Sequence, residues 1–313
     1  MDPDMAFGLS INVSILSYGG KAMELSLSTT PVSIKDGIVS IPFGDLHLGT
    51  LVSRPNRFLA VVNVNGKIVE AHVSDPGRLE ELLFSGNKVM VRHINPNSEA
   101  KKSARKTAYD LVLAAFEDIW VCVDTRYPND IFEVALRKRV LREFSGYTQI
   151  QREVTFERAI SLIDPERNTN FSQQGFMLRD DEKTSAAKKT PTSRFDFLLM
   201  GPKCRPFLLE VKSVNLCIDG IGLFPDAPTM RGARHVRELA ALSSPRMSTG
   251  VMFIAQREDV TKVTAHRKMD PEFAAALDEA QEAGVKVMAV RCIASPEELR
   301  LDPQPIPYVK HVP

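Results

Sequence analysis

Two acidic side chains and one lysine lie in two neighbouring apolar stretches, SRFDFLLM and FLLEVKSV. Each stretch is typical of a short strand, and the Gly-Pro-Lys tract between them predicts a turn. Side chains two residues apart share one face of a strand, so Glu210 and Lys212 should point the same way. If the two strands pair, Asp196 lies beside Glu210. The pattern predicts two carboxylates and an ammonium group on an otherwise apolar surface.

These three groups suit metal-assisted hydrolysis of a phosphodiester. Buried charges need a partner, and carboxylate oxygens are the ligands that a hard divalent cation prefers. We expect Asp196 and Glu210 to bind Mg²⁺ or Mn²⁺, which would lower the pKa of a bound water. Lys212 would orient that water or stabilise charge on the phosphate. The alternative is an ordinary cross-strand pair of Glu and Lys on a solvated face, but the apolar flanks favour the metal site.

The composition indicates a soluble globular protein with room for two domains. The chain has 313 residues, of which 43% are hydrophobic and 25% charged. A formal net charge of +1 excludes a uniformly basic coat, so any nucleic acid must bind to local clusters. The four cysteines form no CxxC pair and predict reduced thiols. Without a bilayer-spanning apolar run or a basic signal sequence, we expect a cytoplasmic protein with no membrane partner.

The first part of the chain predicts a small β-barrel. After an N-terminal extension of residues 1–42, residues 43–126 contain several alternating apolar stretches. An Asn-Gly pair predicts a hairpin turn between two of them. The segment DPGRLEELL predicts a short helix capped by Asp75. Strands, one short helix and further strands are typical of a five-stranded barrel of the oligonucleotide-binding (OB) type.

Residues 127–294 predict an α/β domain with a central mixed sheet flanked by helices. A first helix is expected over DIFEVALRKRVLREF, with Asn129 as its cap. Residues 164–193 are polar and predict a mobile surface insertion. The two acidic strands follow, and then two helices alternate with the strands TGVMFIAQ and VKVMAVRCI. The second of these helices should be capped by Asp270. Residues 295–313 are expected to be an irregular tail.

Several motifs resemble one known family. They are GTLVSRPNRFLAVV, DPGRLEELLFSG, DTRYPND, SRFDFLL, LLEVKSVNL, FPDAPTMRGARHVREL and GVKVMAV. In this order they resemble the sugar fermentation stimulation protein family (SfsA). The resemblance implies an N-terminal OB-like barrel followed by a restriction-endonuclease-like domain of the PD-(D/E)xK type. It also implies binding of double- or single-stranded DNA and an Mg²⁺-dependent nuclease activity.

The resemblance also assigns roles to individual acidic residues. Asp196 matches the first acid of the nuclease motif, and Glu210 with Lys212 matches the acid-x-lysine pair. Glu133 matches an acid that such nucleases often place on the helix before the sheet, so it becomes a third candidate metal ligand. The alternative for Glu133 is a favourable interaction with the dipole of its own helix.

Five basic residues are candidates for contact with nucleic acid: Arg54, Arg57 and Arg78 in the barrel, and Arg231 and His235 on the helix after FPDA. Contacts to phosphates would make binding dependent on salt. For Arg231 and His235 the alternative is a capping or surface role. Phe58 could stack on a base, but its apolar neighbours favour a place in the core.

Three functions compete on these observations. The first is a DNA-binding protein with metal-dependent nuclease activity. The second is a non-catalytic DNA-binding regulator, including transcriptional regulation of sugar metabolism. RNA is a less favoured partner, and recognition of RNA would require contacts to its 2′-hydroxyl groups. The residues indicate no oligomeric state.

Overall fold

Five strands of the first half close into a barrel, which confirms the expected OB-type domain. The closing pair joins Ala71 of β4 to Tyr109 of β6. Alternate residues face the interior, and Leu51 and Val62 are accordingly buried. The strands follow the order β4 (Lys67–His72), β3 (Leu59–Val64), β2 (Leu46–Asn56), β5 (Lys88–His93) and β6 (Tyr109–Phe116).

The connection between β3 and β4 is the predicted hairpin turn. Asn65 and Gly66 have φ angles of 50° and 83°, and a type I′ turn requires positive φ at both positions. The side chain of Asn63 accepts a hydrogen bond from the Gly66 amide at 2.8 Å. The Asn-Gly pair therefore sets the register between these two strands.

The helix predicted over DPGRLEELL is wrong, because this segment forms turns. Leu79 has a φ of 50°, which a right-handed helix does not allow. The side chain of Asp75 accepts from the amide of Gly77 at 2.8 Å, and that of Asp226 accepts from the amide of Leu79 at 3.3 Å. These side-chain oxygens offer the backbone an alternative to helical hydrogen bonds.

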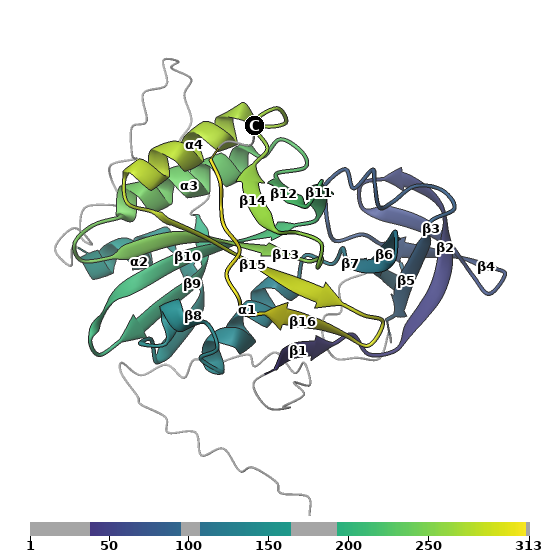
Figure 1. Cartoon of the computed structure of the whole chain (residues 1–313), viewed down its shortest axis with the longest axis horizontal. Coiled ribbons are helices and arrows are strands. Elements are labelled where there is room, and N and C mark those ends of the chain that lie inside the picture. The colour runs from purple at the N-terminus through teal and green to yellow at the C-terminus, as the bar shows by residue number, and fades with distance from the viewer. Residues whose placement is uncertain (1–37, 95–106, 164–192, 311–313) are drawn as a thin grey trace, which may run out of the picture. The chain divides into compact units, whose positions relative to one another are not determined.

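The second half contains the expected mixed sheet. Its strands lie in the order β8 (Gln149–Thr155), β9 (Arg194–Gly201), β10 (Cys204–Val214), β13 (Ser248–Ala255) and β15 (Lys286–Ala294). The pairs on the β8 side are antiparallel, whereas β10, β13 and β15 run parallel (Figure 1). Strand β7 (Ile119–Cys122) pairs with β15 through Trp120 and Ala294, so the sheet continues into the barrel.

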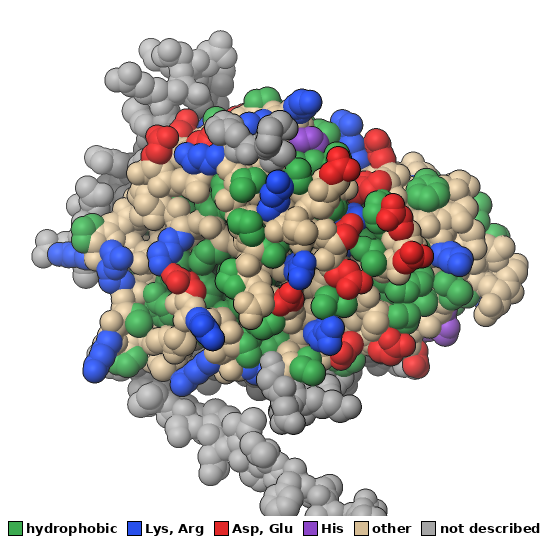
Figure 2. All heavy atoms as spheres, viewed as in Figure 1, with side chains coloured by type: hydrophobic (Ala, Val, Ile, Leu, Met, Phe, Trp, Pro, Cys, Tyr) green, Lys and Arg blue, Asp and Glu red, His purple; other side chains and the backbone are tan. Residues whose placement is uncertain are grey.

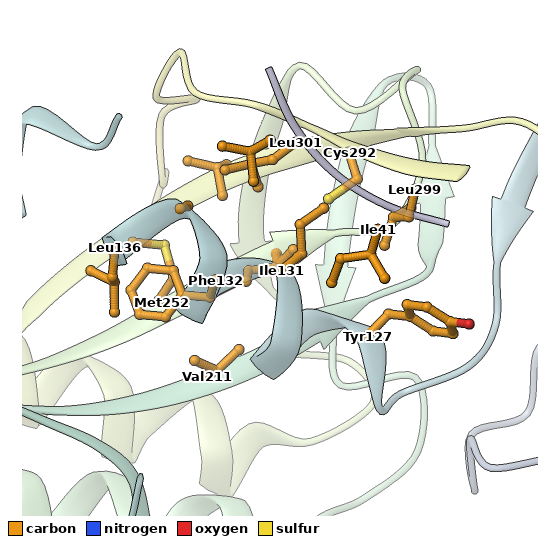
Figure 3. Close-up of a cluster of buried hydrophobic side chains, with 14 of the residues drawn as sticks. Ile41, Tyr127, Ile131, Phe132, Leu136, Val211, Met252, Cys292, Leu299 and Leu301 are labelled. Carbon is orange, nitrogen blue, oxygen red and sulfur yellow. The ribbon is translucent and has the colours of Figure 1, made fainter. Parts of the chain in front are cut away.

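Helices cover both faces of this sheet (Figure 1). On one face lies α1 (Tyr127–Arg137), whose buried residues face Val211 and Met252 in Figure 3. On the other face, α3 (Met230–Leu242) and α4 (Pro271–Glu282) pack on the second hydrophobic core. Burial of these two apolar faces is what fixes the sheet between its helices.

The ends of the helices test the capping predictions. Asp270 accepts a hydrogen bond from the Phe273 amide at 2.9 Å, which confirms it as the cap of α4. Asn129 is not a cap, because α1 already begins at Tyr127. This helix also ends early, since Arg139 has a φ of 55°, and a separate 3₁₀ turn, η1 (Arg142–Phe144), follows.

Some elements were not expected from the sequence. Strand β16 (Glu298–Asp302) lies in the segment expected to be irregular, and it pairs with β1 (Val39–Pro42). Helix α2 (Phe156–Ile163) follows β8. A small separate sheet consists of β11 (Leu216–Ile218), β12 (Ile221–Phe224) and β14 (Lys262–Ala265). Strands this short carry too few alternating residues to be distinguished from loops.

The computed structural model describes residues 38–94, 107–163 and 193–310, all within one compact unit. The first 37 residues lie outside the described residues. So do residues 164–192, and the predicted insertion therefore falls almost entirely outside the described residues. No helix in the described ranges is both long and apolar enough to cross a membrane.

Gly77 offers a test of the contact between the barrel and the second half. A Cβ atom at this position would lie 2.2 Å from both carboxylate oxygens of Asp226. We expect Gly77→Ala to lower the free energy of unfolding by about 1–3 kcal/mol, measured by urea denaturation. In an Asp226→Ala background the same substitution should cost clearly less. An equal cost in both backgrounds would contradict the contact.

Candidate functional site

The pairing of β9 with β10 brings Asp196 and Glu210 together. Leu209 is opposite Phe197 in this antiparallel pair, so the next position along β10 faces the next position back along β9. The Asp196 carboxylate reaches across and accepts from the Val211 amide at 2.7 Å. The geometry assumed from the strand pattern is therefore present, and the catalytic roles stay predictions.

Both oxygens of Asp196 bind neutral donors. Oδ2 accepts from the amide of Val211, and Oδ1 accepts from Nδ2 of Asn129 on α1 at 2.9 Å. Burial, and then the charge of Glu210, raises the pKa of Asp196 to about 6, against the opposing effects of Lys212 and these hydrogen bonds. Asn129 was expected only as a helix cap. Its role at the site depends on α1 crossing β9, which the sequence does not reveal.

Glu210 is buried and ionised. Its Oε1 accepts from Nζ of Lys212 at 2.6 Å and lies 2.7 Å from Nδ1 of His235. Burial alone would raise the pKa of Glu210, but Lys212 and His235 outweigh it and lower the pKa to about 2. The acid therefore carries its charge at neutral pH.

The second oxygen of Glu210 is the most informative atom of the site. Oε2 is buried and has no hydrogen-bond partner among the described residues. A buried carboxylate oxygen without a partner is unfavourable, and such groups call for an explanation such as an ion or a water. An oxygen of this kind beside the carboxylate of Asp196 fits the first ligands of a divalent cation.

His235 does not lie where a nucleic-acid contact requires it. Its side chain is only 2% exposed and faces Glu210. Arg231, one helical turn earlier on α3, is exposed, and its Nε lies 3.4 Å from Nε2 of His235. The predicted contact of His235 with DNA is therefore wrong, whereas that of Arg231 stays a prediction.

Glu133 is not placed with the other two acids. Its Oε1 accepts from Nε of Arg137 at 2.9 Å, and its Oε2 accepts from Nη1 of Arg152 at 3.0 Å. Throughout the described ranges, no three or more His, Cys, Asp or Glu side chains are grouped so that they could hold a metal ion. The structure therefore supplies two acidic candidates, and Glu133 pairs with arginines on and beside its own helix.

The three barrel arginines differ in what they can reach. Arg54 donates to the backbone carbonyl groups of Arg57 at 3.0 Å, of Gly77 at 2.7 Å and of Arg78. Its guanidinium group therefore ties two loops of the barrel together and does not lie free for a phosphate, contrary to the prediction. Arg57 and Arg78 are exposed, as a contact with nucleic acid requires.

Phe58 also departs from the expectation, which favoured a place in the core. Its side chain is 50% exposed. The guanidinium carbon of Arg57 lies 6.0 Å from the centre of its ring. Proteins that bind single-stranded nucleic acids stack the bases on exposed aromatic rings, often with an arginine nearby.

The loop that carries Arg78 is attached to the end of β10, the strand that carries Glu210. Asp75 accepts at Oδ2 from Nδ2 of Asn215, the residue that follows β10, at 2.8 Å. Burial, followed by the charge of Asp226, raises the pKa of Asp75 to about 6. On the face drawn in Figure 2, basic and acidic side chains are interspersed and neither forms a continuous surface.

Two domain models of one protein family match the chain. Residues 52–123 match the "SfsA N-terminal OB domain", and residues 167–298 match the "Sugar fermentation stimulation protein RE domain". A sugar fermentation stimulation protein homolog of Moorella thermoacetica is 37% identical over 264 residues, covering 84% of this chain and 97% of that protein. A homolog of Clostridium botulinum is 34% identical, covering 80% of this chain and 92% of that protein.

A solved structure has a similar fold. It is described as Pyrococcus furiosus SfsA in complex with Ca²⁺, with a TM-score of 0.66 and 24% identity. The match covers 86% of this chain and 98% of that chain. At this level of identity the similarity supports the fold.

The raised pKa of Asp196 predicts a pH dependence of stability. The folded protein keeps the proton of this group up to about pH 6, whereas the unfolded chain loses it near pH 3.8, so ionisation destabilises the fold as the pH rises through this range. Asp196→Asn removes this penalty. The free energy of unfolding of Asp196→Asn minus that of wild type should therefore increase by roughly 2–3 kcal/mol between about pH 4 and about pH 8. A difference that stays constant with pH would contradict the assignment.

Proposed function

The chain belongs to the sugar fermentation stimulation protein family, and we propose that it binds DNA and hydrolyses its phosphodiester bonds with a divalent cation. The observation that carries this proposal is the unpartnered buried oxygen of Glu210 beside the carboxylate of Asp196. An ionised acid that cannot satisfy its own hydrogen bonds is poised to bind a cation.

The proposed fold of the second half is restriction-endonuclease-like, of the PD-(D/E)xK type. It is supported by a mixed sheet in which one strand supplies an acid and the next supplies Glu-x-Lys. The description of the matched domain as an RE domain agrees with this proposal, as does the Ca²⁺ in complex with the similar Pyrococcus furiosus protein. Ca²⁺ and Mg²⁺ both prefer oxygen ligands.

Each residue has a distinct part in the proposed reaction. Asp196 and Glu210 would hold Mg²⁺ or Mn²⁺, which when bound draws charge from the scissile phosphate and activates a water. Asn129 fixes one oxygen of Asp196 through its amide. Lys212 pairs with Glu210 and would also stabilise charge on the phosphate.

The partner in this proposal is DNA, bound in the cytoplasm. Arg57 and Arg78 of the barrel and Arg231 of α3 are exposed and would contact phosphates, while Phe58 would stack on an unpaired base. The hydrogen bond between Asp75 and Asn215 attaches the arginine-bearing loop of the barrel to the end of the acid-bearing strand. A strand bound to the barrel would thereby be guided toward the acids.

A second candidate function is a non-catalytic DNA-binding regulator. It is favoured by the position of Glu133, whose pairing with arginines leaves Asp196 and Glu210 as the two acids for a cation among the described residues. Titration with Mg²⁺ in the presence of DNA separates the two functions. The regulator would bind DNA without cutting it and would keep its affinity for DNA in Asp196→Asn.

The nuclease proposal predicts a strong effect of one conservative substitution. Glu210→Gln keeps the shape of the side chain but removes the charge that binds the cation. Cleavage of single- and double-stranded DNA with Mn²⁺ should fall by at least about 100-fold. Glu272→Gln, which changes an exposed acid on α4, is the matched control and should cut DNA like wild type. Undiminished cleavage by Glu210→Gln would remove the mechanism.

The barrel arginines predict a second, independent result. The salt dependence of DNA binding is the slope of log Kd against the logarithm of the salt concentration. Arg57→Ala and Arg78→Ala should each reduce this slope by about 0.7–0.9 per lost phosphate contact. Both variants should unfold like wild type because these side chains are exposed. Arg54→Ala should instead lower the melting temperature, since it loses the bonds that join two barrel loops. An unchanged salt dependence in both exposed variants would contradict the assigned interface.

A further inference from the structure

A buried histidine stands between an exposed arginine and the proposed metal ligand. Arg231 and His235 are four residues apart on α3, so they lie on one face of the helix. Nε of Arg231 is 3.4 Å from Nε2 of His235, and Nδ1 of His235 is 2.7 Å from Oε1 of Glu210. The chain of contacts runs from the surface to the buried acid.

We propose that His235 is a positioning residue, which fixes Glu210 so that Oε2 remains open to the cation. This inference rests on the proposed function. A carboxylate held by one donor can still rotate about its side-chain bonds, whereas two donors on the same oxygen set its orientation. Lys212 is the other donor, but it ends a long side chain with high rotamer entropy.

The surroundings of the histidine ring make it the more rigid of the two donors. Its side chain is only 2% exposed, and its ring centre lies 6.0 Å from that of Phe195 on β9. Val236 and Leu239 on the same helix are fully buried in the second core. The packing of α3 therefore fixes the ring, and the ring fixes the acid.

The neighbouring arginine indicates which nitrogen carries the proton. Arginine is always a donor, so Nε2 of His235 must accept from it, and the proton of a neutral ring lies on Nδ1. That proton points at Glu210. This donor acts on Oε1, so it orients Glu210 while Oε2 keeps no hydrogen-bond partner among the described residues.

Binding of Mn²⁺ alone, measured by calorimetry on the full chain, tests the proposal. His235→Ala should weaken binding by roughly 10- to 100-fold, the usual effect of losing a group that orients a metal ligand. His235→Asn should recover most of the affinity, because its amide nitrogen occupies the place of Nδ1. Leu242→Ala, a buried residue at the far end of α3, is the control for lost packing, and it should bind Mn²⁺ like wild type while being less stable.

The tautomer of His235 gives a readout that does not need the metal. Nitrogen NMR of the metal-free protein at about pH 8 should show the proton on Nδ1. A proton on Nε2, or equal Mn²⁺ affinities of wild type and His235→Ala, would overturn the positioning role while leaving the nuclease proposal intact. If wild type binds no Mn²⁺ through Asp196 and Glu210, the proposed function fails, and the role of His235 as the partner that orients a cation ligand falls with it.

Discussion

The site depends on one constraint: the charge of Glu210 is buried in the protein core and must be compensated there. A buried carboxylate is unfavourable unless donors compensate its charge. Here the compensation comes from Lys212 on the same strand and from His235 on a helix, and both act on one oxygen. The other oxygen is left without a partner in the described part of the chain. Compensation on one side only keeps the acid charged and leaves its second oxygen without a hydrogen-bond partner among the described residues.

The neighbouring acid is controlled in the opposite direction. Asp196 is buried beside a charge of the same sign, and its donors, Asn129 and the Val211 amide, are neutral. Its pKa is therefore raised to about 6, whereas that of Glu210 is lowered to about 2. A cation between the two would relieve the repulsion that keeps their pKa values apart. Two acids on paired strands thus differ because different helices supply their partners.

Polar contacts also join the barrel to the sheet that carries the acids. Arg257, just after β13, is fully buried and donates to Asp259 at 2.7 Å and to the Asn215 carbonyl at 2.8 Å. The same guanidinium lies 3.8 Å from Glu81 of the barrel. Asn215 in turn donates from its side chain to Asp75 of the barrel, so this one residue contacts both Arg257 and Asp75. Breaking a buried pair of this kind leaves an uncompensated charge, which makes the junction costly to open.

The sequence by itself determined the longer strands of the barrel and of the mixed sheet, the Asn-Gly turn, the cap of α4 and the convergence of Asp196, Glu210 and Lys212. These features follow from residues close together in the chain, through alternation, local hydrogen bonds and a short turn. Tertiary structure decided the partners, placing His235 and Asn129 on the acids and Glu133 among arginines. A histidine or an asparagine on a helix has the same local pattern whatever it contacts. Its partner depends on which strand the helix crosses, and packing of the two hydrophobic cores sets that crossing.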